Sequence, residues 1–389
     1  MFLNKKSIYM DYAATTPADS RVLKKVMPYF SEIFANPSSS HRQGLFVREK
    51  INKARKDIAD ILNCEPEEII FTSGGTESEN LAVKGISFAN KKNGKHVILS
   101  SAEHNAVSSS AEYLKNHGFE VTKIPIDKNC NVNVDTISKS IRDDTVLVSI
   151  IRVNNEIGTI QPIEEIGSII KRINGDRINN GKHPIIFHSD NEAASFYLET
   201  NVKKLNVDST TINSSKIYSI KGAGILYVKN GTEVATQISG GGQEKFLRGG
   251  TENIPAIVGV AEALILANKE RTKNIEHVLA VKNSLIKNIT DKIKDVRLNT
   301  PENSVPYIAH FTFNNPKGRD LVKELSDKGV FVSRGAACSS NKSFSSPVLE
   351  AMGFNEDEIF SSIRFSIGKN NTISETKFIA DSIFDILNA

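Results

Sequence analysis

Short β-rich runs alternate with longer helical segments along the first three-quarters of this chain, and this alternation is the strongest constraint on its fold. The runs cover residues 68–73, 96–101, 120–126, 145–153, 184–190 and 225–230. Helical patterns such as "ESENLAVKGISFA" and "IEEIGSIIKRIN" lie between them. Strands that alternate with helices form βαβ units. The sequence therefore predicts an α/β protein with a mostly parallel sheet.

The last third of the chain has a different pattern. Residues 252–292 read as one long or broken helix that connects two parts of the molecule. Beyond it, the strand-like "YIAHFTF" and "VFVS" mix with the helical "RDLVKELSDKG" and "SETKFIADSIFDIL". A length of 389 residues is long for a single hydrophobic core. We therefore expect a second, smaller α+β domain.

Composition excludes several classes of protein. An apolar fraction of 39% and a charged fraction of 24% are ordinary for a globular chain, and a net charge of +4 is too mild to predict nucleic-acid binding. No segment has the ~20 consecutive apolar residues of a membrane span, and the N-terminus lacks the apolar core of a secretion signal. Cys64, Cys130 and Cys338 form neither a disulfide framework nor a metal-type spacing, so we expect a cytoplasmic protein.

Ligands of such sheets bind beyond the carboxyl ends of the strands, so the segments that follow each strand are the candidate site. After "EIIFTS", Gly74 and Gly75 allow close backbone approach, and a helix begins at about Thr76. The free amides and positive dipole of a helix N-terminus suit a phosphate group. Thr76 and Glu79 also match a capping box, so an ordinary capped helix is the alternative.

Other strand ends carry polar or reactive side chains. His104 follows "HVILSS", and the polar "NNEIG" at 154–158 follows "TVLVSIIRV". Lys216 lies between small residues that leave room for a bulky group against the backbone. Cys338 lies in "SRGAACSS", whose small residues suit an exposed thiol, whereas Cys64 and Cys130 have no such setting.

One strand end, "IIFHSDNEAASF" at 185–196, leaves three interpretations open. His188, Asp190 and Glu192 occupy alternate positions, and a continued strand would turn all three the same way. They could bind a metal, form an acid–base pair or support an organic cofactor.

Taken together, these segments resemble the NifS-like cysteine desulfurases, a branch of the class V aminotransferases that use pyridoxal phosphate (PLP). The matching motifs are "YMDYAATTP", "ANPSSSHRQG", "FTSGGTESENLAVKG", "EHNAV", "VNNEIGTIQPI", "HSD", "SKIYSIKGAGILYV", "GGGQEKFLRGGTEN", "GAACSS" and "SIRFSIG". The resemblance implies the type I fold of PLP-dependent transferases. It also implies a large PLP-binding domain at 16–258, a small C-terminal domain at 259–389 that carries the catalytic cysteine loop, and an N-terminal segment at 1–15 that packs with the small domain.

The resemblance also implies roles for residues that match the family's motifs. Lys216 would form the Schiff base with PLP and act in catalysis. Asp190 would pair with the pyridinium nitrogen, and His104 would stack on the ring. Gly75 and Thr76 would bind the cofactor phosphate. With PLP accounting for this strand end, no metal is expected.

Four further residues receive roles on the same basis. Asn155 would lie beside the ring and the substrate, and Arg364 would bind the substrate carboxylate. Thr251 would reach the phosphate in the partner subunit of a homodimer. Cys338 would be the catalytic sulfur acceptor.

Three matched positions depart from the family's pattern. Ala193 stands where a Gln normally bonds the phenolic oxygen of PLP, a loss of about 1–3 kcal/mol if nothing compensates. Ser215 replaces the His that precedes the lysine, and Asn213 replaces a phosphate-binding Ser. Both still offer hydrogen-bond donors and are expected to stay in the cofactor site. Glu192 would point away from Ala193 on an extended strand and has no assigned role.

The expected activity is removal of sulfur from L-cysteine, giving L-alanine and a persulfide on Cys338 for iron–sulfur cluster assembly or tRNA thiolation. Alternatives are a selenocysteine or cystine lyase, a related class V aminotransferase, or a catalytically weakened sulfur-relay homologue. The chain ends at "DILNA", without the longer tail by which related housekeeping enzymes dock an iron–sulfur scaffold protein, so that particular partnership is in doubt.

Overall fold

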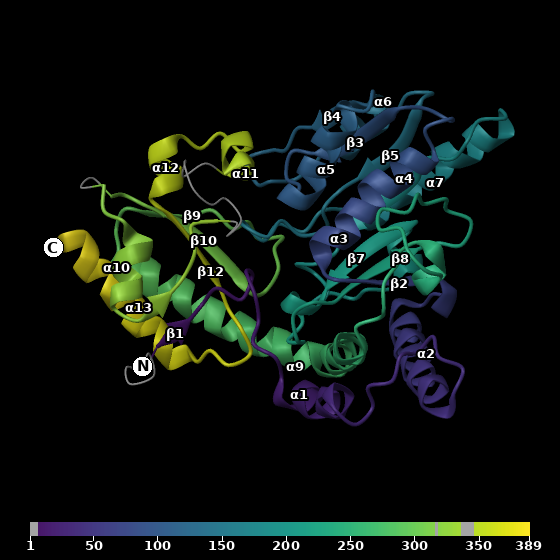
Figure 1. Ribbon diagram of the computed structural model, residues 1–389. Helices are drawn as coiled ribbons and strands as arrows, with labels where there is room; N and C mark the ends of the chain where they lie inside the picture. Colours follow the sequence, from purple (N-terminus) through teal and green to yellow (C-terminus); the bar gives the residue numbers. More distant parts are fainter. Residues whose placement is uncertain (1–6, 316–317, 336–345) are drawn as a thin grey trace.

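The protein is described by a computed structural model that covers residues 7–315, 318–335 and 346–389. Its larger sheet has seven strands in the order β2-β8-β7-β6-β5-β3-β4 (Figure 1). β8 is antiparallel to both of its neighbours, and the other pairs are parallel. The strands are β2 (Ile69–Thr72), β3 (His96–Ser100), β4 (Glu120–Ile124), β5 (Thr145–Ser149), β6 (Ile186–Asp190), β7 (Ser209–Asn213) and β8 (Gly224–Val228). The predicted α/β class with a mostly parallel sheet is confirmed.

Helices cover this sheet and explain why its strands read as apolar runs. Every residue of β3, β5 and β6 is buried, as expected for parallel strands with helices on both faces. β7 was not predicted, because its sequence "STTIN" is polar although four of its five residues are buried. The helical elements of this part are η2 (Pro66–Glu68), α3 (Gly75–Asn80), the π-turn η3 (Leu81–Gly85), α4 (Ile86–Ala89), α5 (Asn105–Lys115), α6 (Val134–Ser140), α7 (Ile163–Asn179), α8 (Val202–Leu205), η4 (Ser214–Lys216) and η5 (Gln243–Phe246).

The predicted connector is one unbroken helix, α9 (Ile254–Lys292), about 58 Å long. It contacts α1 (Ser20–Val26) and α2 (Arg42–Leu62) on one side of the molecule and α13 (Ile373–Asn388) on the other. Figure 1 shows it running along the base of both parts. The short η1 (Met27–Phe30) follows α1 directly.

The smaller part contains an antiparallel sheet in the order β12-β10-β9. The N-terminal β1 (Ile8–Tyr9) pairs in parallel with β11 (Val330–Phe331), so the start of the chain lies against this part. The domain boundaries at 15/16 and 258/259 stay predictions. The remaining elements are β9 (Val296–Leu298), β10 (Ile308–Phe313), α10 (Leu321–Asp327), α11 (Pro347–Ala351), α12 (Glu356–Phe360) and β12 (Ser362–Ser366).

The sheet topology places the candidate site. β2, β3, β5, β6 and β7 run in the same direction, so their carboxyl ends meet at one edge of the large sheet. A single large hydrophobic cluster links this sheet, α9 and the smaller sheet. Within the described residues, no helix combines the length and apolarity that a membrane crossing needs.

Candidate active site

Five of the predicted site residues line one cavity at the shared edge of the strands. They are His104, Asn155, Asp190, Lys216 and Arg364. They come from the entry to α5, the segment after β5, the end of β6, the turn after β7, and β12 of the smaller part. The site therefore lies between the two parts of the molecule, and its cavity has a volume of about 60 Å³.

Lys216 reaches this cavity from a 3-10 turn. Its Nζ donates to the carbonyl oxygens of Ala13 and Ala14, at 2.7 and 2.8 Å. The Thr16 hydroxyl donates to the carbonyl of Ser215 at 2.9 Å, which ties the same N-terminal segment to the turn. The amine is thus positioned by the backbone of Ala13 and Ala14, which also line the cavity.

Arg364 is 1% exposed and is held from two sides. Its guanidinium donates to Asp11 Oδ1 at 2.7 Å and to the carbonyl of Asn155 at 2.9 Å. Its Nε is buried and has no hydrogen-bond partner among the described residues. An unpaired donor on a buried guanidinium beside a cavity fits the binding of an anionic group such as a carboxylate.

His104 caps α5, its Nδ1 accepting the amide of Ala106 at 3.1 Å. His104 and Asn155 also line an adjoining hollow, together with Ser346 and Val348. Cys338, the predicted sulfur acceptor, lies outside the described residues.

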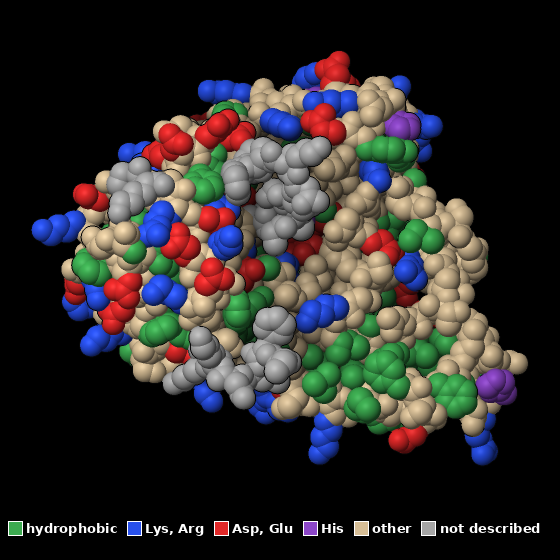
Figure 2. All heavy atoms as spheres, turned by 60° about the vertical axis from the view of Figure 1, so that its left-hand side comes forward, with side chains coloured by type: hydrophobic (Ala, Val, Ile, Leu, Met, Phe, Trp, Pro, Cys, Tyr) green, Lys and Arg blue, Asp and Glu red, His purple; other side chains and the backbone are tan. Residues whose placement is uncertain are grey.

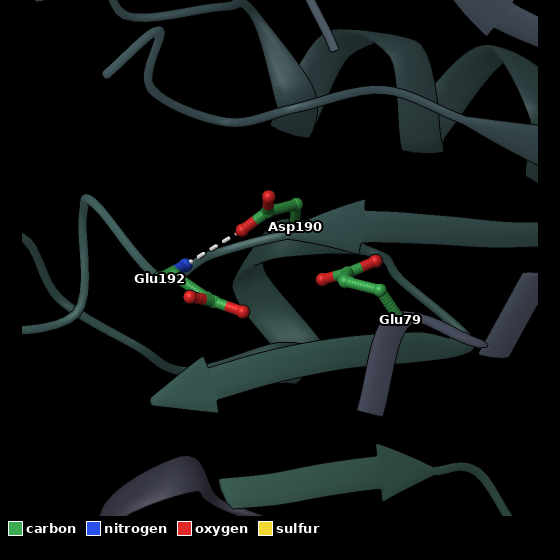
Figure 3. Close-up of side chains that lie close together, drawn as sticks. All are labelled: Glu79, Asp190 and Glu192. Carbon is green, nitrogen blue, oxygen red and sulfur yellow. Dashed lines mark hydrogen bonds between the residues drawn. The ribbon is translucent and has the colours of Figure 1, made fainter. Parts of the chain in front are cut away.

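Three carboxyl groups converge beside Lys216, and the structure corrects the expected trio. β6 ends at Asp190, so the alternation of His188, Asp190 and Glu192 does not continue. Instead Glu79, Asp190 and Glu192 each place an oxygen within 4.8 Å of the others. Figure 3 shows the carboxyl groups of Glu79 and Glu192 turned toward one another, and the amide of Glu192 donates to Asp190 Oδ1 at 2.9 Å. The absence of a metal stays a prediction.

Crowding and burial shift the proton affinities of this cluster. Burial first, and then the nearby Glu79, raise the pKa of Asp190 to about 7. Burial and the charge of Asp190 raise the pKa of Glu192 in the same way. Adjacent carboxylates repel one another, so these groups keep their protons more readily than an exposed carboxyl group does. A cation bound beside them would favour their ionised forms. A ring N–H⁺ next to Asp190 would be such a cation.

Glu79 does not form the predicted capping box. The N-cap of α3 is Gly74, and no side chain caps the helix there. Glu79 is instead fully buried, bonded to His188 Nε2 at 2.9 Å and to the hydroxyl of Thr211. Burial raises the pKa of Glu79 well above its usual range and lowers the pKa of His188 to about 4, so the pair shares one proton between uncharged partners.

The unusual residues of the site form one hydrogen-bonded chain. The hydroxyl and amide of Ser215 donate to Asn213 Oδ1, and Asn213 Nδ2 donates to Glu192 Oε2 at 2.9 Å. The Glu192 carboxyl then lies directly against Gly75, the first residue of α3, where a Cβ would collide with it. Glu192, given no role from the sequence, is part of the site. Its predicted direction failed because the chain turns immediately after Asp190.

Two predicted cofactor ligands lie apart from this cavity. Thr76 is exposed in the first turn of α3, and Thr251 is exposed in the segment before α9. The side chain of Ala193 supplies no polar atom, while its carbonyl accepts the hydroxyl of Tyr307 at 2.8 Å.

The side chains of this cavity fit PLP, except that a carboxyl group of the protein lies where the cofactor phosphate would bind. A lysine amine, a carboxyl group with a raised pKa and a buried guanidinium with a free Nε match an aldehyde, a ring nitrogen and a substrate carboxylate. Gly75 supplies a backbone surface without Cβ at the start of a helix, as a phosphate needs. That surface already faces the Glu192 carboxyl.

Sequence reasoning missed Glu79 and Glu192, and only Glu79 had a signal that holds in the structure. In the helix that continues from α3 to α4, Gly75, Glu79, Ala82, Val83 and Ile86 are buried at the spacing of one helix face. A carboxyl group on that face had to be buried. Glu192 was marked only by its alternation with His188 and Asp190, and that pattern does not hold because β6 ends at Asp190.

Comparison with known proteins agrees with this site. Residues 8–378 match the family Aminotransferase class-V. The protein named cysteine desulfurase IscS from Methanosarcina thermophila is 41% identical over 383 residues, which cover 98% of this chain and 92% of that protein. Its namesake from Dictyoglomus turgidum is 39% identical over 98% of this chain and 95% of its own length.

Solved structures show the same relationship. A structure named NifS-like protein superposes with a TM-score of 0.90 at 33% identity, over 98% of this chain and 99% of that one. A structure named SspA in complex with cysteine gives a TM-score of 0.80, also at 33% identity, over 94% of this chain and all of that one. The chain therefore belongs to the class V aminotransferases and, within them, to the NifS-like cysteine desulfurases.

Proposed function

We propose that this protein is a PLP-dependent cysteine desulfurase, which converts L-cysteine to L-alanine and leaves a persulfide on Cys338. The observation that carries the proposal is the convergence of Lys216, Asp190, His104 and Arg364 on one cavity from four distant parts of the chain. These are the groups that a PLP enzyme needs for one amino-acid substrate.

PLP, when bound, supplies an electron sink for negative charge that develops at the substrate Cα. Lys216 would hold the cofactor covalently and then move a proton from the substrate Cα. Asp190 would hold a proton on the ring nitrogen, and His104 would cover the ring. Arg364 would grip the substrate carboxylate, for which its guanidinium geometry is suited.

The two cysteines within the described residues, Cys64 and Cys130, are poorly suited to accept sulfur, which supports Cys338 as the acceptor. Burial raises the pKa of Cys64 to about 12, and burial raises the pKa of Cys130 further. Both are free thiols, and Cys130 is fully buried. A sulfur acceptor must be a thiolate that the substrate can reach, so neither is suited to that role.

We also propose a homodimer that acts in a reducing cytoplasm. Large exposed apolar side chains are concentrated on α1, η1, the segment after η1 and the start of α2, and such a concentration is typical of an interface. They are Leu23, Met27, Phe30, Phe34, Leu45 and Phe46. A dimer would also give the exposed Thr251 a cofactor to contact. The sulfur would pass to an iron–sulfur scaffold protein or a tRNA-thiolating enzyme.

The test is incubation of the PLP-loaded protein with L-cysteine and a reductant, with alanine and protein-bound persulfide both measured. We expect Lys216→Ala to abolish both products and Cys338→Ala to abolish desulfuration. Cys64→Ala is the matched control and should leave both unchanged. If the wild-type protein releases no alanine, the proposal is wrong.

The same assay separates the alternatives. A selenocysteine lyase would release alanine from selenocysteine without needing Cys338. A catalytically weakened sulfur-relay protein would accept persulfide on Cys338 from another enzyme but make no alanine itself.

A further inference from the structure

Glu192 places a negative group of the protein where a negative group of a ligand would bind. Its carboxyl lies against Gly75, and both of its oxygens fall in the space that a Cβ there would occupy. Gly75 begins a helix that runs through α3, η3 and α4 to Ala89, with αR backbone angles at the joints. First-turn amides of a helix have no acceptor within it, and its dipole attracts an anion.

This placement is held rather than accidental. Asn213 Nδ2 donates to Glu192 Oε2 at 2.9 Å, and Ser215 fixes the other end of the Asn213 amide at 3.0 and 3.1 Å. Asn213 and Ser215 are two of the three positions that depart from the family's pattern. The departures therefore work together, since they orient a carboxyl toward the start of α3.

The charges that face Glu192 come from five elements. Asp190 of β6 and Glu79 of α3 are acidic and lie within 4.8 Å. Lys216 of η4 lies in the same cavity. His104 at the entry to α5 and Arg364 of β12 also line it. An incoming phosphate would place a dianion against the Glu192 carboxylate, which costs free energy unless Glu192 is neutral or moves.

We propose that Glu192 is an internal anion that competes with the PLP phosphate for the start of α3, so that the cofactor binds only when Glu192 takes up a proton or swings away. The inference rests on the proposed function, since it assumes that PLP is the ligand. It adds to that function a control on the binding of PLP to the apoprotein, which is separate from the reaction with cysteine.

The consequence is a cofactor affinity that depends on the state of one side chain. The raised pKa of Glu192 makes its protonation accessible near neutral pH. Lowering the pH neutralises Glu192 and removes the repulsion, so loading is favoured by acid. The other groups of the site and the PLP phosphate are the same in every variant, so the ratio of two affinities at one pH reports on Glu192.

The experiment measures PLP binding to the apoprotein by equilibrium dialysis and by the visible absorbance of the lysine-bound cofactor, at about pH 6 and about pH 8. Glu192→Gln keeps the shape of the side chain and an oxygen that can accept the Asn213 amide, but it removes the negative charge. At pH 8 we expect this variant to bind PLP at least about tenfold more tightly than the wild type. At pH 6 the ratio should shrink toward unity.

Glu199→Gln is the matched control, because Glu199 follows the same strand, is exposed and pairs with Lys204 at 2.9 Å. It should bind PLP like the wild type. Glu192→Ala is the second variant and should also bind more tightly at pH 8. Equal affinities of wild type and Glu192→Gln at pH 8, or a ratio that does not change with pH, would overturn the inference.

The two proposals can fail separately, because PLP affinity tests the role of Glu192 and alanine formation tests the desulfurase activity. Tighter PLP binding by Glu192→Gln without alanine formation would uphold the inference and reject the desulfurase. Alanine formation with equal affinities would do the reverse. Failure of every variant to bind PLP would reject both.

Discussion

At the scale of single residues, the site is governed by how three carboxyl groups are neutralised. Glu79 shares a proton with His188, Asp190 accepts the amide of Glu192, and Glu192 accepts Asn213. Each carboxyl group has one good donor, which for Glu79 is the Thr211 hydroxyl, and one donor is too little for a full negative charge in a buried position. The shifts toward higher pKa follow from this shortage, and they prepare the site for a cationic ring nitrogen.

The pKa of Asp190 predicts how the stability of the apoprotein depends on pH. Its pKa is about 7 in the folded chain, against its usual value near 4 when unfolded, so the folded state binds this proton more tightly. The free energy of unfolding should therefore fall as pH rises from about 4 to about 7, by on the order of a few kcal/mol from this group.

Urea denaturation of the apoprotein across this range checks the prediction. Asp190→Asn should show a flatter profile than the wild type. Asp143→Asn is the control, because Asp143 is exposed and bonded to Lys182, with a lowered pKa. Parallel profiles for wild type and Asp190→Asn would contradict the assignment.

At the scale of elements, the site depends on α3 being locked to the sheet. Glu79 is the link, because it reaches from α3 to His188 on β6 and Thr211 on β7. Gly75 is positioned by the same contact, since it lies one helical turn before Glu79. A helix that shifted along β7 would move the phosphate surface relative to Lys216.

Substitution of Glu79 tests this link. Glu79→Ala leaves the ring nitrogen of His188 and the Thr211 hydroxyl without partners, and should lower the free energy of unfolding by about 2–4 kcal/mol. Glu79→Gln can still donate to His188 and accept from Thr211, and should cost less than about 1 kcal/mol. Chemical denaturation measures both. Equal losses in the two variants would show that the hydrogen bonds do not matter.

At the scale of the whole molecule, the site is assembled from the larger and the smaller part of one chain, and we expect it to be completed in a homodimer. Arg364 comes from the smaller sheet, Asp190 from the larger sheet, and Lys216 from the turn η4 that follows β7 of the larger sheet. Figure 2 shows apolar side chains gathered at the lower part of the molecule, where Figure 1 places α1 and α2. Phe30 and Phe34 are 60% and 65% exposed there, which a lone protomer would leave in water.

We expect light scattering after size-exclusion chromatography to give about twice the 42.7 kDa of one chain. The double variant Phe30→Glu/Phe34→Glu should give monomers and retain PLP poorly, because Thr251 would lose its place in the neighbouring site. Ile178→Glu changes a side chain that is 59% exposed on α7 and is the control. A double variant that stays dimeric would place the interface elsewhere.

The sequence by itself determined the class of fold and the chemistry of the main groups. Apolar runs separated by helical patterns predicted all strands of the large sheet except β7, and the helix at 254–292, because burial on both faces leaves a readable pattern. Lys216, Asp190, His104 and Arg364 were predicted from motifs shared with the family, and the structure places them around one cavity.

Only the tertiary structure decided which carboxyl groups meet. Glu79 and Asp190 are 111 positions apart, and their contact depends on how α3 packs across β6 and β7, which no local pattern encodes. β7 escaped prediction for a related reason: Thr210 and Thr211 are buried because their hydroxyls find acceptors on Ser189 and Glu79. Glu192 faces Gly75 because the chain turns after Asp190 and Asn213 holds the carboxyl there. These outcomes are set by hydrogen bonds between distant segments, whose partners exist only once the chain has folded.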